Sequence, residues 1–105
     1  MGISREAYFK PQQLQRKFKH AYRFEVQGNY NLANAKNFKQ ALTNYIKDSQ
    51  IIPIRGTHRK TQSVLHFYHP ETKINVMLDL EHNFISGWKL GEGQALDLLK
   101  TGNVQ

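Results

Sequence analysis

The sequence predicts an α+β fold with two N-terminal helices, a roughly four-stranded antiparallel twisted sheet and a short C-terminal helix. Apolar residues recur at helical spacing up to about residue 48 and at a spacing of two from about residue 50 to 90. The strand-like segments are evenly spaced and joined by short turns, which is typical of an antiparallel meander. Helices followed by strands favour a layer of helices packed on one face of a sheet.

The length of the chain, 105 residues, fits one domain. Residues 1–11 have no clear period and end at Pro11, so we expect a linker or flexible arm before a single domain at 12–105. No apolar run is long enough to span a bilayer, and the first residues lack the apolar region of a secretory signal. The absence of cysteine excludes disulfides and thiolate chemistry.

The first helix begins near Gln12 and fades near Phe24, and it is followed by a loop with a turn at Gly28-Asn29. Its apolar stripe consists of Leu14, Phe18, Ala21 and Tyr22. The second helix has Asn31 or Asn34 as its N-cap and ends at Asp48-Ser49. Its stripe consists of Ala35, Phe38, Ala41, Leu42, Tyr45 and Ile46.

The alternating half of the chain predicts the strands. Pro53 cannot donate to a ladder, so the segment 50–58 is expected at an edge of the sheet. Further strands are predicted at 63–69, 74–80 and 84–90, with tight turns between them. The final helix covers 94–100 and is stopped by Gly102.

The positive charge is concentrated in the first part of the chain. The net charge is +7, but residues 1–60 carry twelve Lys and Arg against three acidic residues, whereas residues 61–105 carry three against five. A local excess of this kind attracts a polyanion, with nucleic acid as the first candidate. A basic but inert surface is the alternative.

One histidine of the first helix stands among cations. On a helical wheel His20 lies opposite the apolar stripe, with Lys17 one turn earlier and Lys19, Arg16 and Arg23 on its other side. Like charges disfavour the imidazolium, so we expect the pKa of His20 to lie below its usual range in the free protein. A neutral imidazole can take a proton, and a bound phosphate would favour the protonated form.

This setting suits the transesterification of a phosphodiester. The reaction uses the ribose 2′-OH as nucleophile and needs a base, an acid and cationic support, but no metal. A surface histidine in a basic helix is the plainer alternative. In the last strand Ser86 and Trp88 share a face, so Trp88 could belong to the core or could stack on a base while Ser86 bonds a phosphate oxygen.

The remaining histidines give weaker signals. His66 and His69 lie on opposite faces of a strand and make a poor metal pair, so no metal site is predicted. His58 lies in the segment RGTHRK, where Arg59 and Lys60 suggest a patch that contacts phosphate rather than a catalytic group.

Several segments together resemble a known family. KFKHA, GNYN, the long helix after it, the HFYHP turn, INVMLD and NFISGWKL look like the catalytic domain of colicin D and related toxin domains, from about Leu14 to Gly102. Such domains are anticodon-loop ribonucleases with the barnase/EndoU/colicin/RelE type of fold. The resemblance implies that His20 is the catalytic histidine, flanked by Lys17 and Lys19, with Ser86 and Trp88 completing the site.

By this resemblance the chain is expected to be a metal-independent tRNA endonuclease toxin that leaves a 2′,3′-cyclic phosphate and a 5′-hydroxyl. A non-catalytic RNA-binding module of the same fold is the alternative. The expected RNA-binding residues are Arg16, Arg23, Arg59, Lys60 and Lys89.

The expected partners are tRNA and an acidic immunity protein, for a monomer that needs no cofactor and no membrane. The parent would be a larger secreted or cell-surface bacterial toxin, a bacteriocin or a contact-dependent growth inhibition protein, that acts in the cytoplasm of the target cell.

Overall fold

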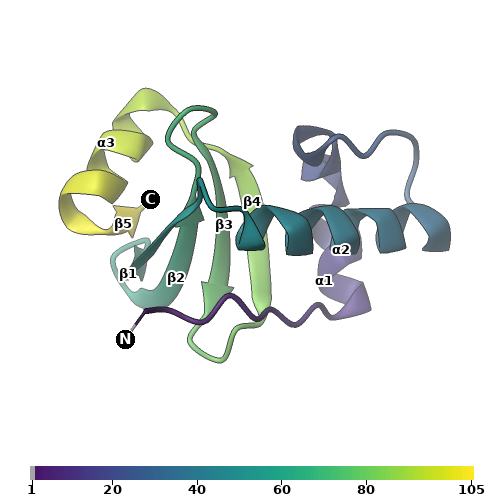
Figure 1. The fold of residues 1–105 in the computed structure, drawn as a ribbon, viewed down its shortest axis with the longest axis horizontal. Coiled ribbons are helices and arrows are strands. Elements are labelled where there is room, and N and C mark those ends of the chain that lie inside the picture. Colours follow the sequence, from purple (N-terminus) through teal and green to yellow (C-terminus); the bar gives the residue numbers. More distant parts are fainter. Residues whose placement is uncertain (1) are drawn as a thin grey trace.

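The computed structural model describes residues 2–105 and has the predicted α+β fold (Figure 1). In chain order the elements are α1 (Pro11–Lys17), the 3₁₀ helix η1 (Phe18–Phe24), α2 (Leu32–Lys47), β1 (Ile52–His58), β2 (Gln62–Tyr68), β3 (Ile74–Asp79), β4 (Phe84–Lys89), α3 (Glu92–Thr101) and β5 (Asn103–Val104). Over the described range, none of these helices has the length and apolar character needed to cross a membrane.

The sheet has five strands in the order β4-β3-β2-β1-β5. The four long strands form the expected antiparallel meander. The sequence pattern does not predict the fifth strand, in which Asn103 and Val104 pair in parallel with Thr57 and His58 at the end of β1. This short strand leaves β1 without a second neighbour at Pro53, which is consistent with the missing N–H of proline.

The helices cover both faces of the sheet. On one face α2 buries Phe38, Leu42 and Ile46 against residues that include Leu65 and Phe67. On the other face Ala95 and Leu98 of α3 pack with Tyr68. The expectation of helices on a single face is therefore wrong for α3, because consecutive residues of a strand point to opposite faces and β2 is apolar on both.

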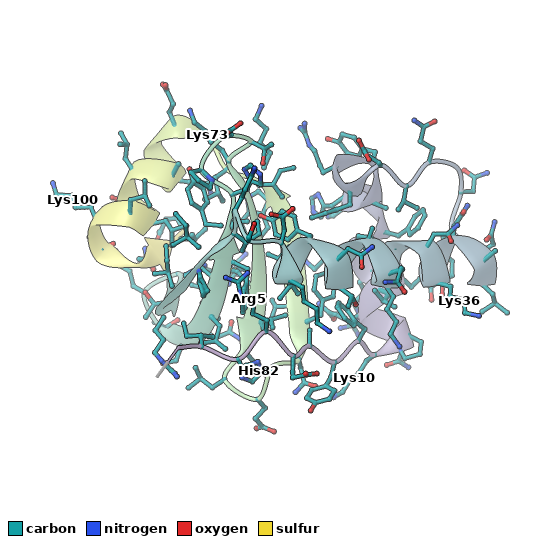
Figure 2. All side chains as sticks on the ribbon, viewed as in Figure 1. Arg5, Lys10, Lys36, Lys73, His82 and Lys100 are labelled. Atoms are coloured by element: carbon teal, nitrogen blue, oxygen red, sulfur yellow. The ribbon has the colours of Figure 1, made fainter. Side chains whose placement is uncertain are left out.

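The N-terminal segment lies along the domain. The Arg5 guanidinium donates to the carbonyls of Ile46 (2.9 Å) and Asp48 (2.8 Å) at the end of α2. Tyr8 forms a β-bridge with Asn83, and Phe9 packs on Phe84 at 5.4 Å between ring centroids. Figure 2 shows Arg5 on this segment and His82 beside it. Within the described part of 1–11, residues 3–9 are thus held by hydrogen bonds and apolar contacts; Met1 lies outside the described residues.

Two glycines join β5 to the sheet. Gly102 ends α3 in the left-handed conformation, φ 79°, which glycine adopts without steric cost. Gly56 of β1 lies so close to Gly102 that a Cβ there would be 1.8 Å from the Gly102 oxygen. The buried His66 side chain links β1 to the end of α3, since its Nε2 lies 3.1 Å from the Thr57 carbonyl oxygen and 3.0 Å from the Gly102 carbonyl oxygen. Nε2 therefore carries the proton, and Nδ1 accepts from the Asn75 amide at 3.0 Å.

We predict that Gly56→Ala will destabilise the domain, because the new methyl group has to displace backbone rather than a flexible side chain. Overpacking of this kind costs about 1–3 kcal/mol or more, a fall in Tm of roughly 5–15 °C for a domain of this size. The measurement is thermal unfolding by circular dichroism. Gly93→Ala is the control, because nothing lies within 4 Å of the added Cβ in α3. Equal Tm values for both variants would contradict the close contact.

Candidate functional site

The predicted site helix is a 3₁₀ helix, and its spacing sets which residues face the sheet. A 3₁₀ helix has three residues per turn, so positions three apart fall in one row. Ala21 is buried, and Phe18 and Phe24 pack against the same core cluster. The next row begins at Lys17, the N-cap of η1, and continues through His20. His20 is therefore half-buried, next to the row of Phe18, Ala21 and Phe24. A regular α-helix would place it on the fully exposed side, opposite the apolar stripe.

Tyr22 shows the consequence of the tighter helix. The sequence places Tyr22 in the apolar stripe, whereas its side chain is 57% exposed in the structure. An α-helix rotates each residue by 100° and a 3₁₀ helix by about 120°, so the altered phase from Phe18 onward turns Tyr22 to solvent. The guanidinium of Arg23 lies 4.7 Å from the centroid of the exposed ring.

Gly87 lets η1 approach β4 closely. A Cβ at Gly87 would lie 3.1 Å from Cζ of Phe24 and 3.2 Å from Cγ2 of Val76. The side-chain amide of Gln13 in α1 also donates to the Ile85 carbonyl of β4. Because β4 is the edge strand of the sheet, a side chain from η1 can reach around it. His20 does so, with its ring centroid 6.5 Å from that of Trp88.

A β-bulge in β4 aims Ser86 and Trp88 at the face opposite η1. The pairing shifts between Met77, which faces Ser86, and Leu78, which faces Phe84. The extra residue, Ile85, reverses the face on which the following side chains lie. Phe84 therefore packs in the core with α2, whereas Ser86 and Trp88 share the other face, as their spacing predicts.

The sheet is curled, and the curl brings the end of β1 to β4. His58 and Trp88 lie on strands that are three positions apart in the sheet. In a flat sheet three strand spacings amount to about 14 Å. The His58 and Trp88 ring centroids are only 6.1 Å apart. Trp88 therefore contacts two histidines, one that comes around the β4 edge and one from β1.

These elements enclose an open hollow of about 290 Å³. It is lined by Lys17, His20, His58, Arg59, Ile85, Ser86, Trp88 and Gln105. Four of the five predicted catalytic residues are in this set. Lys19, the fifth, does not line the hollow, but its charge acts on the His20 imidazole.

The expected RNA-binding residues are distributed over several surfaces. Arg59 lines the hollow itself, while Arg23 and Lys89 line a neighbouring hollow of about 500 Å³ together with Tyr22 and Lys73. Lys60 lines a different hollow, with Asp97 and Thr101 near α3. Arg16 is exposed on α1 and lines neither of the two adjacent hollows.

His58 is the residue whose position the sequence did not reveal. The segment RGTHRK indicates a phosphate-contacting patch, but the imidazole lies in the hollow beside Trp88. The local signal that could have placed it is strand alternation, since His58 shares a face of β1 with Ile54, the partner of the buried His66. The contact with β4 depends on the curl of the sheet, which no local pattern encodes.

No Asp or Glu side chain among the described residues forms an ion pair with the cations of the hollow. Within residues 2–105 the one ion pair closer than 4 Å joins Lys73 to Glu92, at 3.9 Å, away from the hollow. Burial and then the charge of Lys19 hold the pKa of His20 below its usual range, with smaller contributions from Lys17 and Arg23. The direction agrees with the expectation from like charges, although burial is the larger cause.

The same environment acts on the other titratable side chains of the hollow. Burial, then Lys19, Arg59 and Arg16 lower the pKa of the Lys17 ammonium. Burial and Arg59 lower the pKa of His58, although a hydrogen bond with the Gln62 side chain opposes them. An anion bound in this hollow would relieve the repulsion between these groups. In the part of the chain that the structure describes, no cluster of three or more His, Cys, Asp or Glu side chains could hold a metal ion.

The chain is similar to known toxin and ribonuclease domains. The family model described as Colicin D matches residues 13–97. Colicin-D of Escherichia coli is 28% identical over 83 residues, which is 78% of this chain but 12% of the length of that relative. The solved structure of a ribonuclease from Escherichia coli in complex with its inhibitor protein superposes with a TM-score of 0.76 at 26% identity. The likeness covers 88% of this chain and all of the solved one. The chain therefore belongs to the colicin D family.

Proposed function

We propose that this domain is a metal-independent endoribonuclease toxin that cleaves tRNA, in the anticodon loop, by attack of a ribose 2′-OH on the adjacent phosphate. Membership of the colicin D family and the likeness to an Escherichia coli ribonuclease make the chain an endoribonuclease. The observation that carries the proposal is the position of His20, which lies among unpaired cations and faces a hollow with a hydroxyl and an indole.

Each of the five predicted catalytic side chains has a role in this reaction. His20, neutral in the free protein, takes the proton of the 2′-OH, since a base must be unprotonated before it acts. Lys17 lines the hollow and Lys19 lies beside His20, so both can stabilise the negative charge that builds up on the phosphorane. The Ser86 hydroxyl can donate to a phosphate oxygen, and the Trp88 indole offers a surface on which a base can stack.

The neighbouring hollow extends the cationic surface away from the reacting phosphate. Arg23, Lys73 and Lys89 line it, together with one acidic residue, Glu71, and the exposed ring of Tyr22. Contacts of this kind position an RNA strand without reading its sequence. Because these residues do not line the hollow that contains His20, the cations expected to act on the transition state are Lys17, Lys19 and Arg59.

A non-catalytic RNA-binding module remains the second candidate for the same surface. A binding module has no use for a half-buried histidine with a pKa below its usual range, whereas a proton acceptor requires one. The two candidates differ in a single readout, because only the enzyme produces new RNA ends.

The likeness to a ribonuclease solved with its inhibitor also supports a protective partner in the producing cell. We propose a small immunity protein of negative net charge, since carboxylates placed where phosphates would bind match the cations of the hollow. The domain would act as a monomer, within a larger toxin delivered to the cytoplasm of a target cell.

The experiment that tests the function is incubation of the protein with total bacterial tRNA in EDTA, followed by sequencing of the fragment ends. We expect discrete cuts that leave 2′,3′-cyclic phosphate and 5′-hydroxyl ends. Binding without new ends would favour the RNA-binding module. Cleavage that stops in EDTA and returns with a divalent cation would contradict the metal-independent mechanism.

His20→Ala should lower cleavage in this assay by about 100- to 10,000-fold, the usual loss for one acid–base group. Its Tm should stay close to that of the wild type, because His20 is half-buried and makes no hydrogen bond that fixes the fold. His69→Asn is the control, since His69 lies in the β2–β3 turn outside the hollow. Activity of His20→Ala within a few-fold of the control would remove His20 from the mechanism.

The pKa of His20 should rise in Lys19→Gln. After burial, Lys19 is the largest cause of the lowered value, and loss of a like charge favours the imidazolium. NMR titration of the His20 ring protons measures the change directly in the free protein. Lys36→Gln on α2 (Figure 2) is the matched control, because Lys36 is not among the groups that act on the pKa of His20. An unchanged or lower pKa in Lys19→Gln would show that the electrostatic account is wrong.

A further inference from the structure

We propose that His58 is a second catalytic residue, which donates a proton to the 5′-oxygen that leaves when His20 activates the 2′-OH. The inference deepens the proposed ribonuclease function and rests on it. Transesterification needs both a proton acceptor and a proton donor, and one histidine cannot fill both roles in a single step. Among the side chains that line the hollow, His58 is the other imidazole.

The two histidines enter the hollow from different sides. His20 comes from η1 and reaches around the β4 edge, whereas His58 comes from β1, three strands away. Their ring centroids lie 6.5 Å and 6.1 Å from that of Trp88. In an in-line displacement the attacking and leaving oxygens are on opposite sides of the phosphorus. A base and an acid that enter from separate elements match this requirement.

The backbone of His58 is held on both sides. His58 pairs with Gln62 of β2 and with Val104 of β5, and the N–H of Arg59 donates to the Val104 carbonyl at 2.7 Å. The buried His66 bonds to the carbonyls of Thr57 and Gly102 next to these residues. A catalytic group needs a rigid support of this kind, because small displacements cost large factors in rate.

The charges around His58 suit a donor that gains its proton when substrate binds. Arg59 lies on its own segment, Lys17 faces it from α1, and His66 lies next to it on β2. The lining of the hollow contains no Asp or Glu side chain. These cations disfavour the imidazolium in the free protein, and the phosphate of a bound RNA would favour it. Burial and nearby cations lower the pKa of both histidines, so the assignment of His20 as the base and His58 as the acid is part of the proposal and rests on their separate positions in the hollow.

A role as a simple phosphate-binding cation explains His58 less well. Lys17 and Arg59 already supply permanent positive charge in the same hollow. An imidazole whose pKa lies below its usual range carries little charge at neutral pH, but it exchanges a proton readily. The sequence context of His58 suggests phosphate contact, and its position in the fold favours chemistry.

The proposed step is balanced in atoms and charge. Neutral His20 takes the proton of the 2′-OH as the 2′-oxygen forms a bond to phosphorus. The bond between phosphorus and the 5′-oxygen breaks, and protonated His58 gives its proton to that oxygen. The products are a 2′,3′-cyclic phosphate and a 5′-hydroxyl, with His20 protonated and His58 neutral. Exchange with water restores both histidines.

The test compares His58→Gln, His58→Lys and His20→Ala on two substrates. One is tRNA, and the other is the same tRNA with sulfur in place of the 5′-oxygen at the cleaved bond. A thiolate leaves without being protonated, so the second substrate needs a base but no acid. Melting temperatures of the variants verify that each is folded, and the cleavage site comes from end mapping with the wild type.

His58→Gln should lower kcat/KM on tRNA by about 100- to 10,000-fold and should remove the fall in rate at high pH. It should recover most of this loss on the sulfur substrate, whereas His20→Ala should not. His58→Lys should stay as inactive as His58→Gln on tRNA.

Near wild-type activity of His58→Lys on tRNA would overturn the inference, because a permanent cation would then be sufficient. The inference would also be overturned if His58→Gln lowered kcat/KM by the same factor on both substrates. In both cases cleavage by the wild type leaves the proposed function intact. Failure of the wild type to cut tRNA would instead refute that function.

Discussion

The contact between the Phe24 ring and Gly87 is the constraint on which the site depends. Without a side chain at Gly87, the 3₁₀ helix lies against the edge strand of the sheet. Lys17 and His20 lie three residues apart, in the helix row next to the buried row, and they line a hollow on the other face of the sheet. A larger residue at 87 would move the helix outward, and the imidazole would move with it.

The opposite wall of the hollow depends on the curl of the sheet and on its last strand. The bulge at Ile85 turns Ser86 and Trp88 away from the main core, and the curl brings His58 to within 6.1 Å of Trp88. Gly56 allows β5 to dock at the end of β1. The lining of the hollow is thus assembled from segments distant in sequence, namely α1 with η1, β1 with Arg59, β4 and the C-terminal Gln105.

Local patterns predicted the parts of the molecule that depend on neighbouring residues. Ser86 and Trp88 are two residues apart, and this spacing correctly predicted that they share one face of the strand. The helical period of α2 correctly identified Phe38, Leu42 and Ile46 as core residues. The position of His20 next to its cations follows from the chain itself, since the neighbours that lower its pKa are Lys17, Lys19 and Arg23.

The features that the sequence did not predict depend on long-range contacts. The sequence pattern places Tyr22 in the core because it assumes α-helical spacing, whereas the segment is a 3₁₀ helix in which Tyr22 is exposed. Arg5 holds the N-terminal segment through carbonyls more than forty residues away. The approach of His58 to Trp88 likewise spans three strands. Patterns within a short window carry no information on such contacts.

The most direct test of this account is the kcat/KM of Gly87→Ala on tRNA, measured beside its affinity for tRNA. The added methyl group would lie 3.1 Å from the Phe24 ring, so the ring, or the helix that carries it and His20, has to give by a few tenths of an ångström while the lysines and arginines keep their charge. A displacement of about 1 Å can cost on the order of 100-fold in rate, and a smaller one costs correspondingly less. We predict a loss of at least tenfold in kcat/KM with affinity changed less than threefold. A folded Gly87→Ala variant that cleaves tRNA at the wild-type rate would contradict the central claim.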